Sequence, residues 1–498
     1  MQFNSVDFMV FFPVVLIIYF LIPKKGRTIW LLFASYFFYM SWNPKYAILI
    51  AGSTLITYIC GILLEKCSTN GAEKAKLNKI IIVAICLVVN LLILVIFKYG
   101  NFLIDSVNGI LKLLHITVID GRFNLLLPVG ISFYTFQALG YIIDVYRGDV
   151  KAEKNLVRYA LFVSFFPQLV AGPIERSKNL LSQIQKIQDI KLWNAKRVTS
   201  GAILMVWGLF IKMVIADRVS ILVDTVFDNY YMYGSTELII AAMGFALQIY
   251  CDFNSYSTIA IGAAKIMGFE LMENFNTPYF SKNIRDFWSR WHISLSTWFK
   301  DYLYIPLGGN RKGKLKKAVN LLIVFLVSGL WHGANWSFVV WGGLHGLYQI
   351  IADCVKPLRQ KIEKYIKTNC FSWNFAEIFV TFCLVDFAWI FFRADTVSDA
   401  IGFIRRIFMF PTPWTLFNGG AFNLGLDRVE MNILLLGIII LILVDLVRYC
   451  KKVTIDTFLM EQNLWFEWFC VIALIFMIFV FGEYGPSFDA KQFIYFQF

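Results

Sequence analysis

Long apolar runs alternate with short polar or basic segments along most of the chain. A helix that crosses a lipid bilayer needs about 20 predominantly apolar residues. The clearest candidates are 6–22, 28–42, 46–64, 80–97, 198–216, 431–449 and 465–481, and less regular ones are 125–146, 156–171, 237–251, 256–269, 318–352 and 374–392. The pattern predicts about ten to twelve crossings, with some segments re-entrant or lying at the membrane surface.

The composition supports this prediction and changes the meaning of the net charge. Of the 498 residues, 58% are hydrophobic and only 16% are charged, whereas soluble domains are about a quarter charged. We therefore predict an all-α polytopic membrane protein. The net charge of +13 then indicates basic cytoplasmic loops, because the lysines and arginines lie between apolar runs and form no basic module for nucleic acid.

The distribution of lysine and arginine predicts the orientation of the spans. The segments expected on the cytoplasmic side are 23–27, 65–79, 175–197, 309–317 and 448–452, and the acidic or neutral segments 219–237 and 411–430 are expected outside. The last span then runs outward and places the tail 482–498 outside. The first apolar run lacks a preceding basic segment and a small-residue cleavage site, so we expect a retained span and not a signal peptide.

One block, 285–346, combines aromatic, charged and histidine side chains more densely than the rest. In its first half an apolar stripe recurs at helical spacing, formed by Trp288, Trp291, His292, Leu295 and Phe299. This spacing predicts one amphipathic helix, which suits a membrane interface or the wall of a polar cavity. The sequence IPLGG then ends the helix, and a strongly basic loop follows.

The second half of the block contains SGLWHGANW, with His332 at its centre. This histidine follows Lys317 by about 20 Å of helix, which places it inside the membrane. An ionisable side chain at that depth is a functional candidate by default, although a buried histidine also serves simply to bond a neighbouring group. Two of the four histidines fall in polar-aromatic motifs beside small residues, which favours a site. Trp331 and Asn335 are candidates for lining its cavity.

The other histidines and the cysteines suggest no further centre. On a continuous helix His345 lies about 220° around from His332, so we expect a structural or outer-layer role, and His115 is expected in a loop or at the interface. The nine cysteines lie mostly in apolar runs without CxxC or metal-ligand spacing. HExxH is also absent, and we expect no metal.

Histidine is suited to moving a proton near neutral pH, and a hydroxyl acceptor needs such a base to become a good nucleophile. No GxSxG elbow indicates a serine hydrolase. A base in the membrane, a polar cavity and a basic inner loop predict transfer of an acyl group from a cytoplasmic thioester to a hydroxyl, with His332 as the base. The loop residues expected to hold the anionic donor are Arg311, Lys312, Lys314, Lys316 and Lys317. Topology alone is the alternative explanation of this loop.

Several stretches, in order along the chain, carry a resemblance: FYTFQALGYIIDVYRGD (133–149), SFFPQLVAGPIER (164–176), FWSRWHISLSTWFKDYLYIPLGGNRKG (287–313), SGLWHGANWSFVVWGGLHG (328–346) and WIFFRADTVSDA (389–400). They resemble the membrane-bound O-acyltransferase (MBOAT) family, in its bacterial alginate O-acetyltransferase branch. The resemblance implies a ring of tilted helices around a funnel-like centre and a pair of polar residues, the second an essential histidine. Here the pair is His292 and His332, and His332 matches the catalytic histidine.

The resemblance also implies one integral-membrane domain over 1–498, with N-terminal spans in 1–125, a catalytic core in 126–400, and C-terminal spans and an extracellular aromatic tail in 401–498. The implied function is O-acetylation of an extracellular polysaccharide at the plasma or inner membrane. The implied partners are a cytoplasmic acyl donor (acetyl-CoA or an acyl-carrier protein), an extracellular SGNH-type acetyltransferase, the polysaccharide and membrane lipids. We expect no tightly bound cofactor, and the position of the basic residues between apolar runs predicts no nucleic-acid partner.

One segment departs from the family pattern. QIYCDFNSYSTIAIG (248–262) resembles a stretch that usually reads like DFSGYSDMAIG, with Asn254, Ser255 and Thr258 in place of Ser, Gly and Asp. The lost acidic group leaves the acceptor and donor open. Asp252 is a further candidate for lining the cavity, and helix capping explains it equally well.

Three alternatives remain open at this point. Within the family, D-alanylation of teichoic acid from a carrier protein shares the same histidine and basic loop. A transporter or polymer-export channel is a different class, but such proteins tend to show paired halves, and no internal repeat is visible here. An inactive scaffold that recruits a secreted partner is the third.

The chain ends in FIYFQF, residues 493–498. An aromatic anchor at the outer membrane surface is one interpretation of this segment. The other is an acyl relay, in which the aromatic residues hold the tail in the funnel mouth and Tyr495 presents its phenol to His332. A phenol is a good leaving group, with a pKa of about 10.

Overall fold

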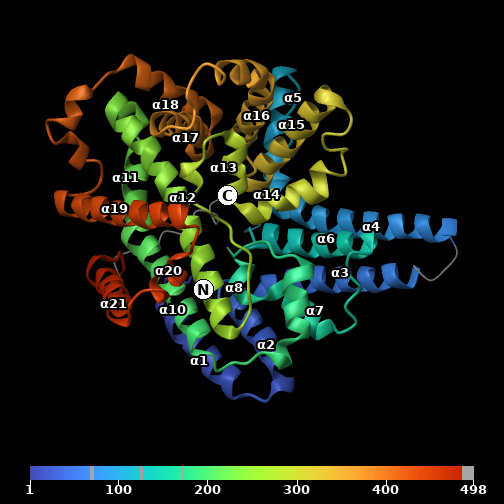
Figure 1. Ribbon diagram of the computed structural model, residues 1–498. Helices are drawn as coiled ribbons and strands as arrows, with labels where there is room; N and C mark the ends of the chain where they lie inside the picture. The colour runs from blue at the N-terminus through green and yellow to red at the C-terminus, as the bar shows by residue number, and fades with distance from the viewer. Residues whose placement is uncertain (68–71, 124, 126, 171, 485–498) are drawn as a thin grey trace. The chain divides into compact units, whose positions relative to one another are not determined.

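The computed structural model describes residues 1–67, 72–123, 125, 127–170 and 172–484 (Figure 1). Within these ranges the regular elements are helices, and no strand occurs. Nine of the described helices are long and apolar enough to cross a membrane, and Val6–Leu21 is a shorter apolar helix. The prediction of an all-α polytopic membrane protein is confirmed.

The chain forms two compact units. The first contains Met1–Ala202 and Ala260–Met272, and the second contains Ile203–Ile259 and Glu273–Phe498. Two of the boundaries fall inside helices α10 (Ala195–Phe210) and α12 (Ser235–Met267), which each contribute residues to both units, and the third follows Met272 in the loop after α12.

The first unit is built from helices that pack on one another. Its principal helices are α1 (Val6–Leu21), α2 (Arg27–Met40), α3 (Ala47–Cys67), α4 (Ala72–Leu94), α5 (Gly100–Leu113), α6 (Ile131–Arg147), α7 (Leu156–Ser164), α8 (Phe166–Leu169) and α9 (Ser182–Gln185). Helix α3 packs against α4 and α6, and these three lie side by side in Figure 1. His115 lies in an exposed turn after α5, as predicted.

The second unit carries the dense polar-aromatic block. After α11 (Asp217–Phe227) and most of α12 come α13 (Ile284–Arg290), α14 (Ile293–Phe299), α15 (Gly313–His332), α16 (Trp336–Ile362), α17 (Phe371–Arg393), α18 (Val397–Met409), α19 (Arg428–Lys451), α20 (Ile455–Met460) and α21 (Leu464–Phe481). The separate candidates 237–251 and 256–269 are wrong, because α12 is one helix of 33 residues. The polar residues between them do not break it, since Asp252 receives an ion pair from Lys212.

The candidate 318–352 is two helices, α15 and α16, which pack as a tight hairpin. Glycines permit the close approach. A Cβ at Gly342 would lie 2.2 Å from the backbone oxygen of Phe325, and one at Gly329 would lie 2.2 Å from that of Phe338. Small residues at helix contacts are typical of membrane proteins.

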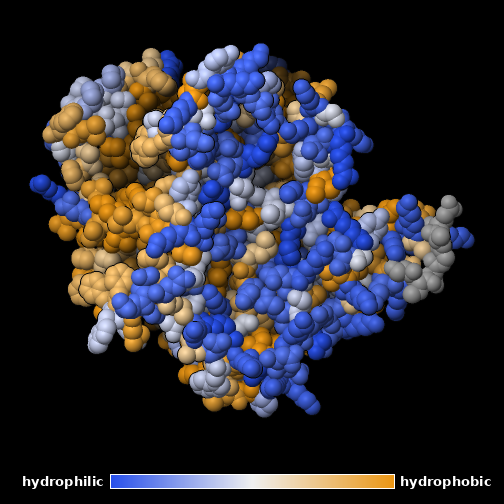
Figure 2. Space-filling model, viewed as in Figure 1, coloured by the Kyte–Doolittle hydropathy of each residue, from blue (hydrophilic) through white to orange (hydrophobic). Residues whose placement is uncertain are grey.

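The outer surface of α19 and α21 is strongly apolar. Exposed side chains on α21 include Trp465, Phe469, Phe476 and Phe479, and the surface over both helices is mostly orange in Figure 2. In a membrane protein such a surface faces lipid. The lipid tails are as apolar as these side chains, so no burial against protein is needed.

Candidate active site

The predicted single helix through 285–299 is interrupted at the site. Helix α13 ends at Arg290, α14 begins at Ile293, and His292 between them has φ 42° and ψ 54°, in the left-handed region. A residue other than glycine holds that conformation only where its surroundings enforce it, at a cost of about 1–3 kcal/mol. The single-helix prediction is therefore wrong, and the reason lies in long-range contacts that periodicity does not reveal.

Two backbone hydrogen bonds fix the interrupted segment. The Asn276 N–H donates to the Arg290 carbonyl at 3.0 Å, and the Ile293 N–H donates to the Asn274 carbonyl at 2.9 Å. The buried Asn274 side chain also donates to Ser257 Oγ at 2.7 Å and accepts from Ser294 Oγ at 2.6 Å. Asn274 thus connects α12, the loop after it and the start of α14 around His292.

The fold brings together the two histidines that the sequence singled out. His332 is the last residue of α15, and its ring centroid lies 6.3 Å from that of His292, with the planes at 62°. Both side chains are buried. The sequence-predicted Trp331 lies beside them, with its ring centroid 5.9 Å from that of His292.

Aromatic side chains form the walls around this pair. Phe253 of α12 lies 4.6 Å from His292 between ring centroids. Trp341 of α16 and Phe392 of α17 lie 5.1 Å and 5.4 Å from His332. The walls bury both imidazoles, His332 at the end of α15 and His292 between α13 and α14, which is a setting that fixes the position of a base.

His292 lies outside the membrane-spanning helices, and burial lowers the pKa of its imidazole to about 3. The ring is therefore neutral at neutral pH, where one nitrogen donates and the other accepts a hydrogen bond. In this form the ring can both donate and accept a hydrogen bond, as orienting a reactant requires.

His345 lies behind the site. Its Nδ1 accepts a hydrogen bond from Trp288 Nε1 at 3.3 Å, and its ring lies 5.2 Å from Trp341. These contacts agree with the predicted structural or outer-layer role. The helical-angle reason given for it was wrong, because residues 333–335 separate His332 from α16.

Asn335 and Asp252 have structural partners that the sequence did not reveal. Asn335 caps α16 by accepting from the Ser337 N–H, and its amide donates to the Asp395 carbonyl. Asp252 lies within α12, so the capping explanation is wrong. It accepts from Lys212 Nζ at 2.5 Å, and Lys212 also pairs with Asp217 at 2.8 Å.

Sequence reasoning missed this buried ion network. Lys212 lies in the apolar run 198–216, and a lone lysine inside a span is itself a signal. In the structure it sits in a π-helical turn, Ile211–Ala216, between α10 and α11. Such turns often mark functional positions. Asn274 was also missed, and it carries no signal in a single sequence.

The basic loop is only partly free to bind a donor. Arg311, Lys312, Lys314 and Lys316 are exposed. Lys317 instead pairs with Asp353 at 2.5 Å, and Asp353 also pairs with Arg285 of α13. Tyr495 lies outside the described residues. Among those that are described, no group of three or more His, Cys, Asp or Glu side chains could hold a metal ion.

Comparison with known proteins adds independent evidence. A sequence model described as MBOAT, membrane-bound O-acyltransferase family, matches residues 149–392, a range that includes both histidines. The chain is 36% identical to a probable alginate O-acetylase of Pseudomonas putida over 99% of each protein. The chain belongs to the membrane-bound O-acyltransferase family. It is therefore a multi-pass membrane enzyme that transfers an acyl group to a hydroxyl.

Two further relatives place this MBOAT protein more closely. It is 30% identical to a peptidoglycan O-acetyltransferase of Helicobacter pylori over 98% of the chain and 95% of that protein. It is 28% identical to a teichoic acid D-alanyltransferase of Bacillus subtilis over 54% of the chain and 69% of that protein. The similarity to proteins named for O-acetyl transfer thus extends through the whole chain.

Proposed function

We propose that this acyltransferase takes an acetyl group from a cytoplasmic thioester donor and moves it across the membrane for O-acetylation of an extracellular polysaccharide. The observation that carries the proposal is the meeting of His332, at the end of α15, and His292, between α13 and α14, within one buried aromatic enclosure. The donor is acetyl-CoA or an acetylated carrier protein, and no tightly bound cofactor takes part.

In the proposed reaction His332 removes the proton from the acceptor hydroxyl as its oxygen attacks the thioester carbonyl. The new C–O bond forms and the C–S bond breaks. The proton then passes from His332 to the departing thiolate, which leaves as the free thiol. Neutral His292 orients the donor or acceptor by hydrogen bonding.

The extent of similarity favours acetyl over D-alanyl transfer. The relatives named for O-acetyl transfer match nearly the full chain, whereas the D-alanyltransferase matches about half of it. The acetyl group is small and neutral, which also suits a site walled by Trp331, Trp341, Phe253 and Phe392. D-alanyl transfer is the alternative outcome of the test below.

The acceptor that receives the acetyl group from His332 is proposed to be the Tyr495 phenol. A long polysaccharide does not readily enter a narrow funnel, and a tethered hydroxyl does. The acetyl-tyrosine then passes its group to an extracellular SGNH-type acetyltransferase, which modifies the polymer.

Mass analysis of the cell-surface polymer tests the function. Cells that carry the wild-type protein should show acetyl esters that cells lacking it do not. A D-alanyl ester would replace the acetyl assignment. If His332→Ala leaves the ester content of the polymer unchanged, the protein acts as a scaffold. If cells lacking the protein fail to export the polymer at all, it acts as a channel.

A further inference from the structure

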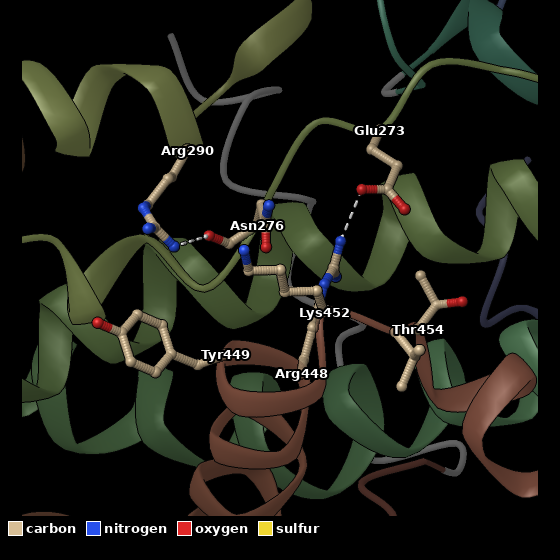
Figure 3. A pocket seen from close by; sticks show the side chains of 8 residues that line it. Glu273, Asn276, Arg290, Arg448, Tyr449, Lys452 and Thr454 are labelled. Carbon is tan, nitrogen blue, oxygen red and sulfur yellow. Dashed lines mark hydrogen bonds and ion pairs between the residues drawn. The ribbon is translucent and has the colours of Figure 1, made fainter.

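A polar pocket of about 420 Å³ lies in the second unit, near the segment that carries His292. Figure 3 shows it from close by. It is lined by Glu273, Asn276, Arg290, Arg448, Tyr449, Lys452, Val453 and Thr454. The charged ends of Arg290 and Lys452 lie beside Asn276, and that of Arg448 points toward Glu273 on the same pocket wall. This volume is within the range of ligand sites, about 300–1,000 Å³.

The charges in this pocket favour an anion. Arg448 pairs with Glu273 at 2.7 Å, and Arg290 pairs with Asp286 at 2.8 Å. Lys452 has no ion pair with any described residue, so the pocket retains a positive charge. Arginine forks and a lysine ammonium are the groups that bind phosphate oxygens most strongly.

The backbone at Lys452 holds this charge in place. Lys452 terminates α19 in the left-handed conformation, with φ 57°, and its N–H donates to the Arg448 carbonyl at 2.8 Å. The conformation turns the chain sharply, so that Arg448 and Lys452 line the pocket together. The segment 448–452 is also one of those expected on the cytoplasmic side.

The pocket and the candidate active site share one short backbone segment, Arg290–Ile293. Arg290 precedes His292 by two residues, a Cα separation of at most roughly 7 Å. Asn276, on the pocket wall, donates its N–H to the Arg290 carbonyl, and Asn274 accepts from Ile293 on the other side of His292. A ligand held by Arg290 would therefore contact the same short segment that positions His292.

We propose that this pocket binds the phosphate of the phosphopantetheine arm of the acyl donor. The inference rests on the proposed function, because it assumes a thioester donor. Phosphopantetheine is common to coenzyme A and to carrier proteins, and its long flexible arm leads from the phosphate to the thioester. A phosphate at Arg290, Arg448 and Lys452 would direct that arm toward His292 and His332.

Direct binding provides the test, using the full chain purified in a neutral detergent. Phosphopantetheine should bind wild type more tightly than pantetheine, which lacks the phosphate, by about tenfold. Lys452→Gln should abolish that difference while leaving pantetheine binding unchanged. Lys451→Gln is the matched control, because Lys451 lies over the Phe458 ring and does not line the pocket.

Equal affinities of wild type for the two compounds, or an unchanged preference in Lys452→Gln, would overturn the proposal. Acetyl transfer distinguishes this failure from failure of the proposed function. A protein that acetylates normally without a phosphate preference loses only the pocket assignment, whereas one that accepts no acetyl thioester loses the function as well.

The transfer assay is run in separate series to find whether the pocket binds the phosphate of coenzyme A, of a carrier protein or of a lipid. Acetyl-CoA and an acetylated carrier protein are supplied in turn, and Lys452→Gln should raise the KM of whichever donor is used. Vesicles of phosphatidylcholine with or without phosphatidylglycerol form the last arm. If Lys452→Gln changes only the response to phosphatidylglycerol, the pocket is a lipid headgroup site and the proposal is wrong.

Discussion

His292 combines a strained backbone with complete burial, and each feature depends on the other. Its left-handed conformation turns the chain between α13 and α14 so that the ring faces His332. The hydrogen bonds around Asn274 offset the cost of that conformation. Strain held in place by surrounding structure is common where a side chain must be aimed at a reactant.

Replacement of His332 tests the proposed base. His332→Ala should reduce acyl transfer at least about a hundredfold, because positioned general bases contribute that much or more. The amount of protein in the membrane should stay near that of wild type. Transfer by purified protein is measured against expression level, and retention of more than about a tenth of activity would remove the general-base role.

Replacement of His292 should have a different signature. Because His292 is proposed to orient a reactant and not to remove its proton, His292→Ala should affect the KM for the donor more than it affects kcat. The measurement is a pair of saturation curves for wild type and variant. A complete loss of transfer in this variant, together with a mild effect of His332→Ala, would reverse the two roles.

The proposed relay role of Tyr495 can be tested by removing its hydroxyl group. Tyr495→Phe should insert and fold normally yet fail to acetylate polymer, because the variant lacks the oxygen that accepts the acetyl group. Mass spectrometry of wild type should find an acetyl group on Tyr495. Normal polymer acetylation by Tyr495→Phe, or by a chain that ends before Phe493, would leave the tail as an anchor.

At the scale of elements, the α15–α16 hairpin sets the position of His332, the proposed base. His332 ends α15, and Asn335 starts α16 three residues later by capping it. The two helices approach closely at Gly329 and Gly342, where a Cβ would meet backbone oxygen. The place of His332 therefore depends on how tightly these helices pack.

Alanine substitutions at two adjacent glycines of α16 distinguish loss of close helix packing from a general effect of replacing glycine in a helix. Gly342→Ala should lower the free energy of unfolding by about 1–3 kcal/mol and reduce acyl transfer, because its Cβ would lie 2.2 Å from the Phe325 backbone oxygen. Gly343→Ala is the matched control, since its Cβ would lie 3.6 Å from Leu326 in ordinary contact. Equal effects of the two substitutions would contradict the packing explanation.

At the scale of the whole molecule, basic residues outnumber acidic ones, and their distribution matters more than their sum. Lys317 is committed to Asp353, and Arg285 shares that carboxylate. Arg311, Lys312 and Lys314 remain exposed near the start of α15. These residues, two before α15 and one in its first turn, thus offer exposed positive charge that a polyanionic donor can reach.

Reversal of Arg311, Lys312 and Lys314 to glutamate should weaken donor binding. The effect should shrink as salt rises, because exposed charges are screened over about 10 Å at 0.1 M salt. The control reverses three exposed lysines, Lys361 in the last turn of α16 and Lys364 and Lys367 between α16 and α17. Donor affinity that is the same in wild type and the loop variant across a salt series would leave topology as the loop's only role.

The sequence by itself determined the class of the protein and most of its candidate residues. Apolar run length and composition are local properties, so they gave the helical membrane architecture without any knowledge of packing. The depth of His332 along one helix marked it as a candidate functional residue for the same reason. The ordered motifs identified the family, which full-length similarity to known acetyltransferases then confirmed.

Only the tertiary structure decided what these residues touch. The break at His292, the continuity of α12 through Asp252 and the pairing of Lys317 with Asp353 all depend on partners far away in the sequence. A buried polar group must find a partner, and which one it finds is fixed by the packing of helices. For that reason spacing along the chain could nominate His292 and His332, while only the fold could bring their rings together.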